Sequence, residues 1–346
     1  MREKLFIIAA ILIMAASCKK DPLPNIGKEC TISIRLNGGK AGTKATDSFH
    51  DTLGVSGGVK ELHIFLFDAN FDNLSTYKKI INPDSLKNIT IKTPMGQKKI
   101  YILANPHIDE GFGGILNEEN FLSLQTSLLK EEPGYFTMIG KDLDFYAGEN
   151  SVADISLERF VSKIVLNSLK TEFAGGPYEG MTLKNVKVYL LNIVGKKVIH
   201  DGSETVPLLV HNLGSNIPAN YSGSMINNIF YDSIPQDIGD AVYTAKHHFY
   251  AYSNTTDVEN SYVKYTKLVI EGTLNGTKYY YPIPVNKTGY GTSNNAGVLR
   301  NTIYIMDVVI KNAGSTTPGY FLPSSSYKTN LTIAPFNAFT LGQVEI

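Results

Sequence analysis

Short stretches of alternating apolar and polar residues recur along most of the chain, separated by turn residues. The first begins at Thr31, and Ile32, Ile34 and Leu36 fall on one face of an extended strand. Only residues 117–131 hold apolar positions near helical spacing, so we expect one or two short helices. Further strands are predicted over 59–68, 89–92, 99–103, 154–166, 183–193, 248–253, 264–271, 278–285 and 301–311, with an Asn-Gly hairpin turn at 275–276.

These strands predict a mainly β protein with two tandem β-sandwiches of the transthyretin-like or Greek-key type. The run 154–166 is long enough to pass from one sheet into another, so we place the domain boundary at residue 160. The N-terminal domain then covers 31–160, the C-terminal domain covers 161–329, and 330–346 form a tail. The composition agrees with this fold, because the chain has 20 Tyr and 16 Phe and these residues suit pleated strands.

Residues 1–17 have the layout of a signal peptide. Basic residues precede an apolar run over 5–16, and three small residues then lead to Cys18. The apolar run of about 12 residues is well short of the roughly 20 that a transmembrane helix needs, so we expect cleavage. Small residues before a cysteine resemble the lipobox of bacterial lipoproteins, which implies that Cys18 receives a diacylglycerol, with 18–30 as a polar tether. An ordinary secretory signal is the alternative.

The charge balance and the cysteine count exclude several classes of function. Lys plus Arg and Asp plus Glu number 32 each, so no overall field attracts nucleic acid. If Cys18 is lipidated, Cys30 is the only other cysteine, and one thiol makes neither an internal disulfide nor a cysteine metal site. We expect no cofactor and no metal.

Catalytic motifs are not found, and we expect a protein that is not an enzyme. The chain contains no nucleophile elbow, no phosphate-binding loop and no zinc-protease motif. The carboxylates at 118–119, 131–132 and 142/144 lie in polar stretches and are interpreted as solvated surface, although two facing carboxylates of a glycosidase remain open. The three tyrosines at 279–281 favour packing against neighbouring strands over a carbohydrate platform.

Several ordered landmarks together resemble the fimbrillin family, the subunits of lipoprotein-derived pili of the Bacteroides group. The resemblance extends over nearly the whole chain. The landmarks are the lipobox at Cys18, Thr43-Lys44-Ala45-Thr46, the Glu-Leu-His-Ile-Phe-Leu-Phe-Asp run at 61–68, Ala104-Asn105-Pro106, Arg-Phe-Val-Ser-Lys-Ile at 159–164 and Arg-Asn-Thr-Ile-Tyr at 300–304.

The resemblance implies a mechanism of polymerisation. The first strand would occupy its own domain during export until a trypsin-like, Arg- or Lys-specific protease cuts the following loop. Lys44 fits the family's cleavage position best, with Arg35 and Lys40 as alternatives. The vacated groove would then accept the C-terminal segment of another copy or of a related pilin. Candidate donor residues are Leu331, Ile333, Phe336, Leu341, Val344 and Ile346.

Three hypotheses follow from these observations. The first is a structural subunit of a fimbrium that is exported as an outer membrane lipoprotein, displayed at the cell surface, and supports adhesion. The second is a fimbrial anchor or accessory protein that keeps its lipid in the membrane and is never cut. The third is a surface lipoprotein that binds a host glycan or protein. A further alternative concerns the tail, whose strands could simply complete the C-terminal sandwich of the same chain.

Overall fold

The computed structural model is mainly β, and it confirms the predicted architecture of sandwiches with short helices. No helix in the described part of the chain is long and apolar enough to cross a membrane. The structure describes residues 27–38, 58–83, 86, 88–108, 111–132, 134–199, 209–211, 231–256, 259, 264–290, 296–320, 322–323 and 325–336.

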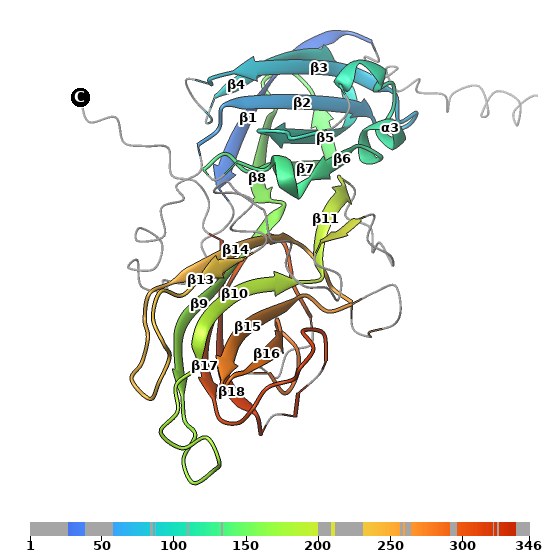
Figure 1. The fold of residues 1–346 in the computed structure, drawn as a ribbon. Helices are drawn as coiled ribbons and strands as arrows, with labels where there is room; N and C mark the ends of the chain where they lie inside the picture. Colours follow the sequence, from blue (N-terminus) through green and yellow to red (C-terminus); the bar gives the residue numbers. More distant parts are fainter. Residues whose placement is uncertain are drawn as a thin grey trace, which may run out of the picture.

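The N-terminal domain is a seven-stranded sheet folded over into two layers (Figure 1). The ends of the sheet meet, because Lys78 Nζ donates to the Thr90 carbonyl at 2.8 Å and Thr76 Oγ1 donates to Thr93 Oγ1 at 2.8 Å. These contacts join β3 to β4 and close the sheet around its core. The strand order is β3 (Leu74–Ile81), β2 (Glu61–Asp68), β5 (Gly96–Ala104), β7 (Met138–Ala147), β8 (Val152–Arg159), β1 (Glu29–Gly38) and β4 (Ile89–Pro94).

Strand β2 is buried on both of its faces. Leu62, Ile64 and Leu66 point into the N-terminal core, whereas Phe65 and Phe67 point to the opposite face. That second face is covered by a segment that contains α3 (Glu118–Leu122), whose Phe121 ring lies 4.8 Å from the ring of Phe65. Burial on both sides explains why the sequence of β2 is an apolar run and not an alternation.

The helix predicted over 117–131 is wrong in its length. Asn117 caps α3 by accepting a hydrogen bond from the Asn120 N–H, and the helix ends at Leu122. The chain then forms β6 (Gln125–Ser127) and the short 3-10 helix η2 (Leu128–Lys130), after an earlier 3-10 turn, η1 (Phe112–Gly114). Pairing of β6 with a strand from the other half of the chain overrides the helical spacing.

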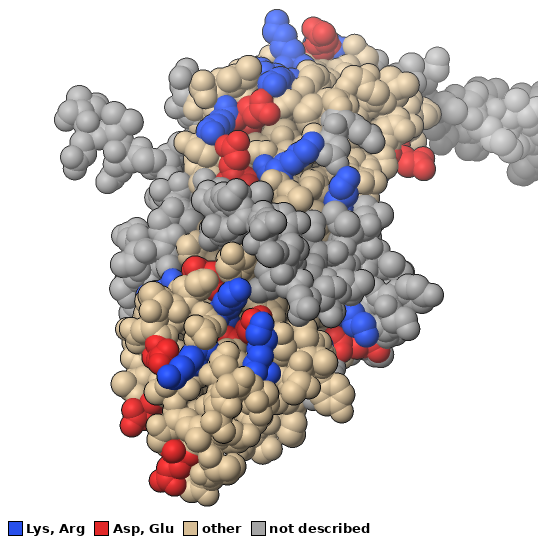
Figure 2. Space-filling view, in the orientation of Figure 1, with Lys and Arg blue, Asp and Glu red and all other residues tan. Residues whose placement is uncertain are grey.

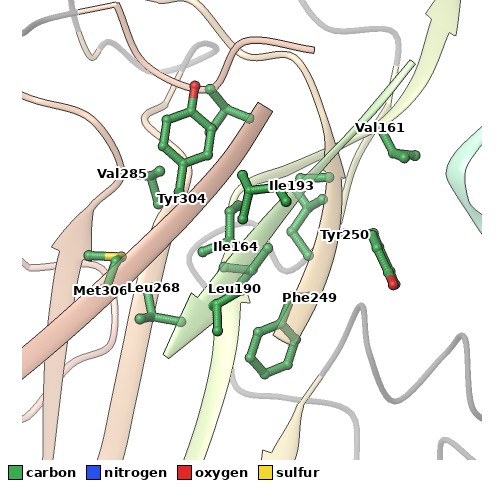
Figure 3. Close-up of a cluster of buried hydrophobic side chains, with 14 of the residues drawn as sticks. Val161, Ile164, Leu190, Ile193, Phe249, Tyr250, Leu268, Val285, Tyr304 and Met306 are labelled. Carbon is green, nitrogen blue, oxygen red and sulfur yellow. The ribbon is translucent and has the colours of Figure 1, made fainter. Parts of the chain in front are cut away.

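The C-terminal domain is a sandwich of two four-stranded sheets. Figure 3 shows its core, where Ile164, Leu190, Leu268 and Met306 come together from four different strands. Asn275 and Gly276 both have positive φ, 49° and 76°, which confirms the predicted hairpin. One sheet is β13 (Asp232–Ser233), β10 (Lys184–Leu191), β15 (Lys267–Leu274) and β16 (Thr277–Pro284), and the other is β14 (His247–Tyr252), β9 (Val161–Thr171), β17 (Thr302–Ile310) and β18 (Tyr327–Pro335).

The two domains are joined by two consecutive strands and by a small sheet. Strand β8 ends at Arg159 and β9 begins at Val161, so the run predicted to cross between sheets does cross, and residue 160 lies at the crossing. The small sheet consists of β12 (Leu209–His211), β11 (Ile193–Val198) and β6, with β6 contributed by the N-terminal half. The expected boundary at residue 330 falls inside β18, where Asn330 pairs with Asp307, so the C-terminal sheet extends past that boundary.

Candidate strand-exchange site

The first strand in the described part of the chain lies between two other strands of its sheet. β1 pairs antiparallel with β4 over residues 29–34 and parallel with β8 over residues 33–38. Strand β8 has few other backbone partners, because β7 pairs with it only at residues 158 and 159. Loss of β1 would therefore leave both β4 and the main part of β8 with an unpaired edge, which is the feature that a strand from another chain can bind.

The side chains of β1 form one wall of the N-terminal core. Ile32 and Ile34 are fully buried, Leu36 is 4 % exposed, and Thr31 and Arg35 point to solvent. Burial of each of the three aliphatic side chains contributes roughly 1.5–3 kcal/mol. Their partners come from the opposite layer and from the flanking strands. The buried members of this cluster that lie outside β1 are Leu62, Ile64, Leu66, Leu86, Ile89, Ile91, Ile100, Ile102, Ala104, Met138, Phe145, Ala147, Ala153, Ile155 and Leu157.

Cys30 occupies the first inward position of β1 and serves as a packing residue. Its thiol is 3 % exposed and donates to the Thr93 carbonyl at 3.4 Å. Burial raises the pKa of the thiol, and the carboxylate of Glu149 raises it further. The four inward positions of β1, which are Cys30, Ile32, Ile34 and Leu36, therefore define four apolar subsites; we call the space that β1 fills the β1 slot.

The predicted cleavage residues do not share one environment. The exposed guanidinium of Arg35 lies 3.8 Å from the Asp154 carboxylate of β8, and its backbone belongs to β1. A cut after Arg35 would leave Leu36 in the slot. Lys40 and Lys44 follow the end of β1 in sequence, so a cut after either one would detach the whole strand. Lys40, Lys44 and the predicted lipidation residue Cys18 lie outside the described residues.

The first part of the predicted donor tail completes the chain's own C-terminal sheet. β18 pairs antiparallel with β17 from Tyr327 to Pro335 and forms the edge of that sheet. Leu331 is half-buried, and Ile333 is 42 % exposed. Thus the structure places Leu331 and Ile333 in the C-terminal domain, away from the slot. Leu341, Val344 and Ile346 lie outside the described residues.

Phe336 follows β18 directly and is buried where the two domains meet. Its side chain is 4 % exposed, and the Arg159 guanidinium carbon lies 4.7 Å from its ring centroid. Arg159 Nη1 also donates to the Phe336 carbonyl at 3.3 Å. The Phe136 ring of the N-terminal domain contacts Phe336 edge-on at 6.1 Å between centroids. Burial lowers the pKa of Arg159 to about 10, so the guanidinium remains charged at neutral pH.

Glu131, which the sequence placed on the surface, is buried at the domain junction. It is 1 % exposed, and its two oxygens accept hydrogen bonds from the Thr137 N–H at 2.8 Å and from the Tyr252 hydroxyl at 2.7 Å. Tyr252 belongs to β14, so this carboxylate connects the domains. Burial is the main reason that the pKa of Glu131 is raised. The surface prediction was wrong because a partner 121 residues away covers the carboxylate.

The tyrosine run, the possible metal ligands and the surface charges do not form a binding site in the described part of the structure. Tyr280 and Tyr281 are buried, and the Tyr281 hydroxyl donates to the Asn312 carbonyl at 3.1 Å, so the tyrosine run packs within the domain as the sequence favoured. Within the described ranges, no three His, Cys, Asp or Glu side chains are grouped to hold a metal ion. On the face drawn in Figure 2, basic and acidic side chains are interspersed over both domains.

Comparison with known proteins finds a family similarity in the N-terminal domain. Residues 30–151 match the family model described as major fimbrial subunit protein (FimA). This stretch of the N-terminal domain is similar to that fimbrial family. The match begins inside β1 and ends just before β8, so it contains the strands β2 to β7. This match confirms the resemblance to fimbrillins that the sequence motifs indicated, and it supports a fimbrial role. None of the curated proteins compared matches the chain.

Solved structures extend the likeness of fold across both domains of this fimbrillin-like chain. A fimbrilin from Porphyromonas gingivalis W83 is 15% identical with a TM-score of 0.64, covering 90% of this chain and 98% of its own. A candidate cell adhesion protein from Bacteroides eggerthii is 20% identical with a TM-score of 0.63, covering 91% and 98%. The tip fimbrial protein Mfa3 from Porphyromonas gingivalis is 14% identical with a TM-score of 0.52, covering 89% and 100%.

Proposed function

We propose that this protein is a structural subunit of a cell-surface fimbrium that polymerises by strand exchange and thereby supports adhesion. The observation that carries the proposal is the position of β1. It is the first strand of the described chain, it is bonded on both edges, and it fills four core subsites. One cut in the chain after such a strand separates it from the strands that follow. The family match of the N-terminal domain supports this function.

In this proposal a trypsin-like protease cuts after Lys44, with Lys40 as the second site. The severed piece contains β1 together with Cys18, so a single cut opens the slot and removes the lipid anchor. In this proposal the lipid serves to export the subunit as an outer membrane lipoprotein and is removed afterwards. After the cut, the exposed edges of β4 and β8 bind the C-terminal segment of another copy or of a related pilin.

The length and pattern of the C-terminal segment suit the β1 slot. β1 has 10 residues, and the segment 337–346 supplies the same number. Four apolar side chains are available for the four subsites: Phe339, Leu341, Val344 and Ile346. The spacing changes by one residue between the second and the third of them. A β-bulge at Gly342 would restore the alternation, because glycine readily adopts the backbone conformation of a bulge.

Limited proteolysis of unlipidated protein, expressed from residue 19 onward, tests this function. Trypsin should release β1, and the cut protein should then form a ladder of oligomers that resist SDS. Deleting 337–346 should abolish the ladder while leaving the cut and the fold intact. A ladder that persists after this deletion contradicts the donor segment. Protein that is cut but stays monomeric contradicts polymerisation and favours an anchor or a glycan-binding or protein-binding lipoprotein.

A further inference from the structure

We infer that Phe336 is the fixed root of the donor segment, that only residues 337–346 leave the subunit, and that Arg159 is the residue that positions this root. The inference rests on the proposed strand exchange and sharpens it. It replaces the earlier expectation that Leu331, Ile333 and Phe336 belong to the donated strand. In this view β18 stays bound to β17 throughout polymerisation, and donation begins after the anchored residue Phe336.

Phe336 is held by its ring and by both of its backbone polar groups. The ring lies between the Arg159 guanidinium and the Phe136 ring, at 4.7 Å and 6.1 Å. The Phe336 N–H donates to the Asn301 carbonyl at 2.9 Å, and the Phe336 carbonyl accepts from Arg159 Nη1 at 3.3 Å. The N–H contact continues the β17–β18 pairing by one residue, and the two contacts with Arg159 attach Phe336 beyond that pairing.

Asn301 and Arg159, which hold Phe336, are themselves held by hydrogen bonds to each other and to β9. The Asn301 N–H donates to the Val161 carbonyl at 3.1 Å, and the Asn301 side-chain oxygen accepts from the Arg159 N–H at 3.3 Å. The positive φ of Asn301, 53°, turns the chain into β17 at this point. Arg159 is itself 2 % exposed and ends β8, the strand whose earlier residues line the β1 slot. The root of the tail is therefore attached to the crossing between the domains.

The composition of β18 also argues against its donation. A strand in the slot must pair on both sides, with β4 and with β8. Pro335 has no N–H to give to either neighbour, and proline is confined to edge strands, which is where β18 lies. Residues 337–346 contain no proline. The inward positions of β18 include Thr329, whose polar side chain would suit an apolar subsite poorly.

A reversible cross-link between β17 and β18 tests the inference in the full-length protein. Ile305 and Thr332 are directly paired residues, so Ile305→Cys with Thr332→Cys should form a disulfide that keeps β18 in place. After trypsin removes β1, we expect the oxidised and the reduced protein to form oligomer ladders at the same rate. Loss of the ladder only in the oxidised form overturns the inference, because β18 must then leave. Loss in both forms overturns the proposed strand exchange itself. The single Thr332→Cys variant controls for the substitution.

Phe336→Ala and Arg159→Met test the root in the same background. Each change removes the contact between Phe336 and Arg159 that fixes the start of the tail. Residues 337–346 must then be ordered when another subunit binds them, which costs conformational entropy. The reduced protein should therefore form its ladder several-fold more slowly. Oxidation should restore the rate of ladder formation, because the cross-link then holds β18 where the contact between Phe336 and Arg159 held it before. A residue that only stabilised the fold would slow both forms alike, and that outcome, or an unchanged rate, would refute the role of Phe336 and Arg159. Circular dichroism should confirm that each variant is folded.

Discussion

The first described strands of the two domains have similar surroundings, yet we propose exchange for only one of them. β1 pairs parallel with β8 and antiparallel with β4, and β9 pairs parallel with β17 and antiparallel with β14. They differ in how the chain is attached. β9 follows β8 after the single residue Phe160, whereas β1 is the first strand of the described chain. The pairing pattern is common to both strands, so the proposed exchange of β1 rests on where the strand lies along the chain.

Burial separates the two strands in a second way. The side chains of β1 alternate between the core and solvent, whereas the first six residues of β9 are all buried. In β9 even a lysine is buried. Burial lowers the pKa of the Lys163 ammonium to about 8, and its Nζ lies 5.8 Å from the Tyr250 ring centroid. A strand with one buried face can be replaced by any sequence that alternates. A strand with two buried faces needs a specific partner on each side.

The largest expected effect comes from blocking the cut that distinguishes β1 from β9. Changing both Lys40 and Lys44 to Gln should leave β1 in place under limited trypsin treatment, so the oligomer ladder should disappear completely. Lys130→Gln, at an exposed position at the end of η2, is the matched control and should not affect the ladder. N-terminal sequencing of the cut product identifies the site. A normal ladder from the double variant would show that cleavage elsewhere, for example at Arg35, opens the slot.

A matched pair of core substitutions tests the comparison next. Ile34 in β1 and Ile164 in β9 are both fully buried, so changing either to Ala should lower the free energy of unfolding by about 2–5 kcal/mol. The two variants should differ in the uncut protein, because only Ile34→Ala weakens a strand that another chain can replace. We expect Ile34→Ala to form some oligomer without protease and Ile164→Ala to remain monomeric. Size-exclusion chromatography alongside chemical denaturation measures both quantities, and equal oligomerisation would remove the distinction.

The buried Glu131 gives a smaller effect that depends on pH. Its pKa in the folded protein is raised above the ordinary value, so at a pH between the two values the folded state holds a proton that the unfolded chain has lost. Raising the pH through that window therefore lowers stability, and the loss is complete above the folded pKa. Glu131→Gln should flatten this dependence. Denaturation of both proteins across the window measures it, with Glu132→Gln, an exposed neighbour, as the control.

Glu131→Ala should instead destabilise at every pH. It would leave the Thr137 N–H and the Tyr252 hydroxyl without the carboxylate that accepts their hydrogen bonds, at a cost of about 1–3 kcal/mol. Because Tyr252 belongs to the C-terminal domain, the junction should loosen, and hydrogen exchange should rise in β6 and β14. Faster exchange in β1 alone would contradict the assignment of Glu131 to the junction.

The sequence predicts the strands whose surroundings are simple. β1 and β4 alternate because one face is buried, and the Asn-Gly turn specifies its hairpin through backbone conformation alone. β3 and β7 were missed. β3 is an edge strand with Lys78 and Lys79 in its middle, and its side chains are half-buried or exposed. β7 carries several charged residues and pairs fully with β5 on one side only.

The candidate site was predictable in its parts and not in its arrangement. Alternation identified Ile32, Ile34 and Leu36 as one inward face, and the tail was identified as strand-forming. The role of Phe336 could not be deduced, because its burial depends on Arg159, which is 177 residues earlier in the chain. Glu131 was misplaced for the same reason. Pairs so distant in sequence leave no periodic signal, so only the fold brings them together.

The smallest expected effect concerns Arg35, an exposed residue of β1 whose side chain forms an ion pair with β8. Arg35→Gln removes an ion pair with Asp154 at 3.8 Å, and both side chains are more than half exposed. Exposed pairs contribute about 0.2–1 kcal/mol, so the uncut protein should unfold at nearly the same denaturant concentration. If the buried side chains hold β1 in its slot, Arg35→Gln should not promote oligomers before cleavage, whereas Ile34→Ala should. Oligomers from uncut Arg35→Gln would show that a surface charge retains β1, and the contrast with β9 would then rest on charge instead of burial.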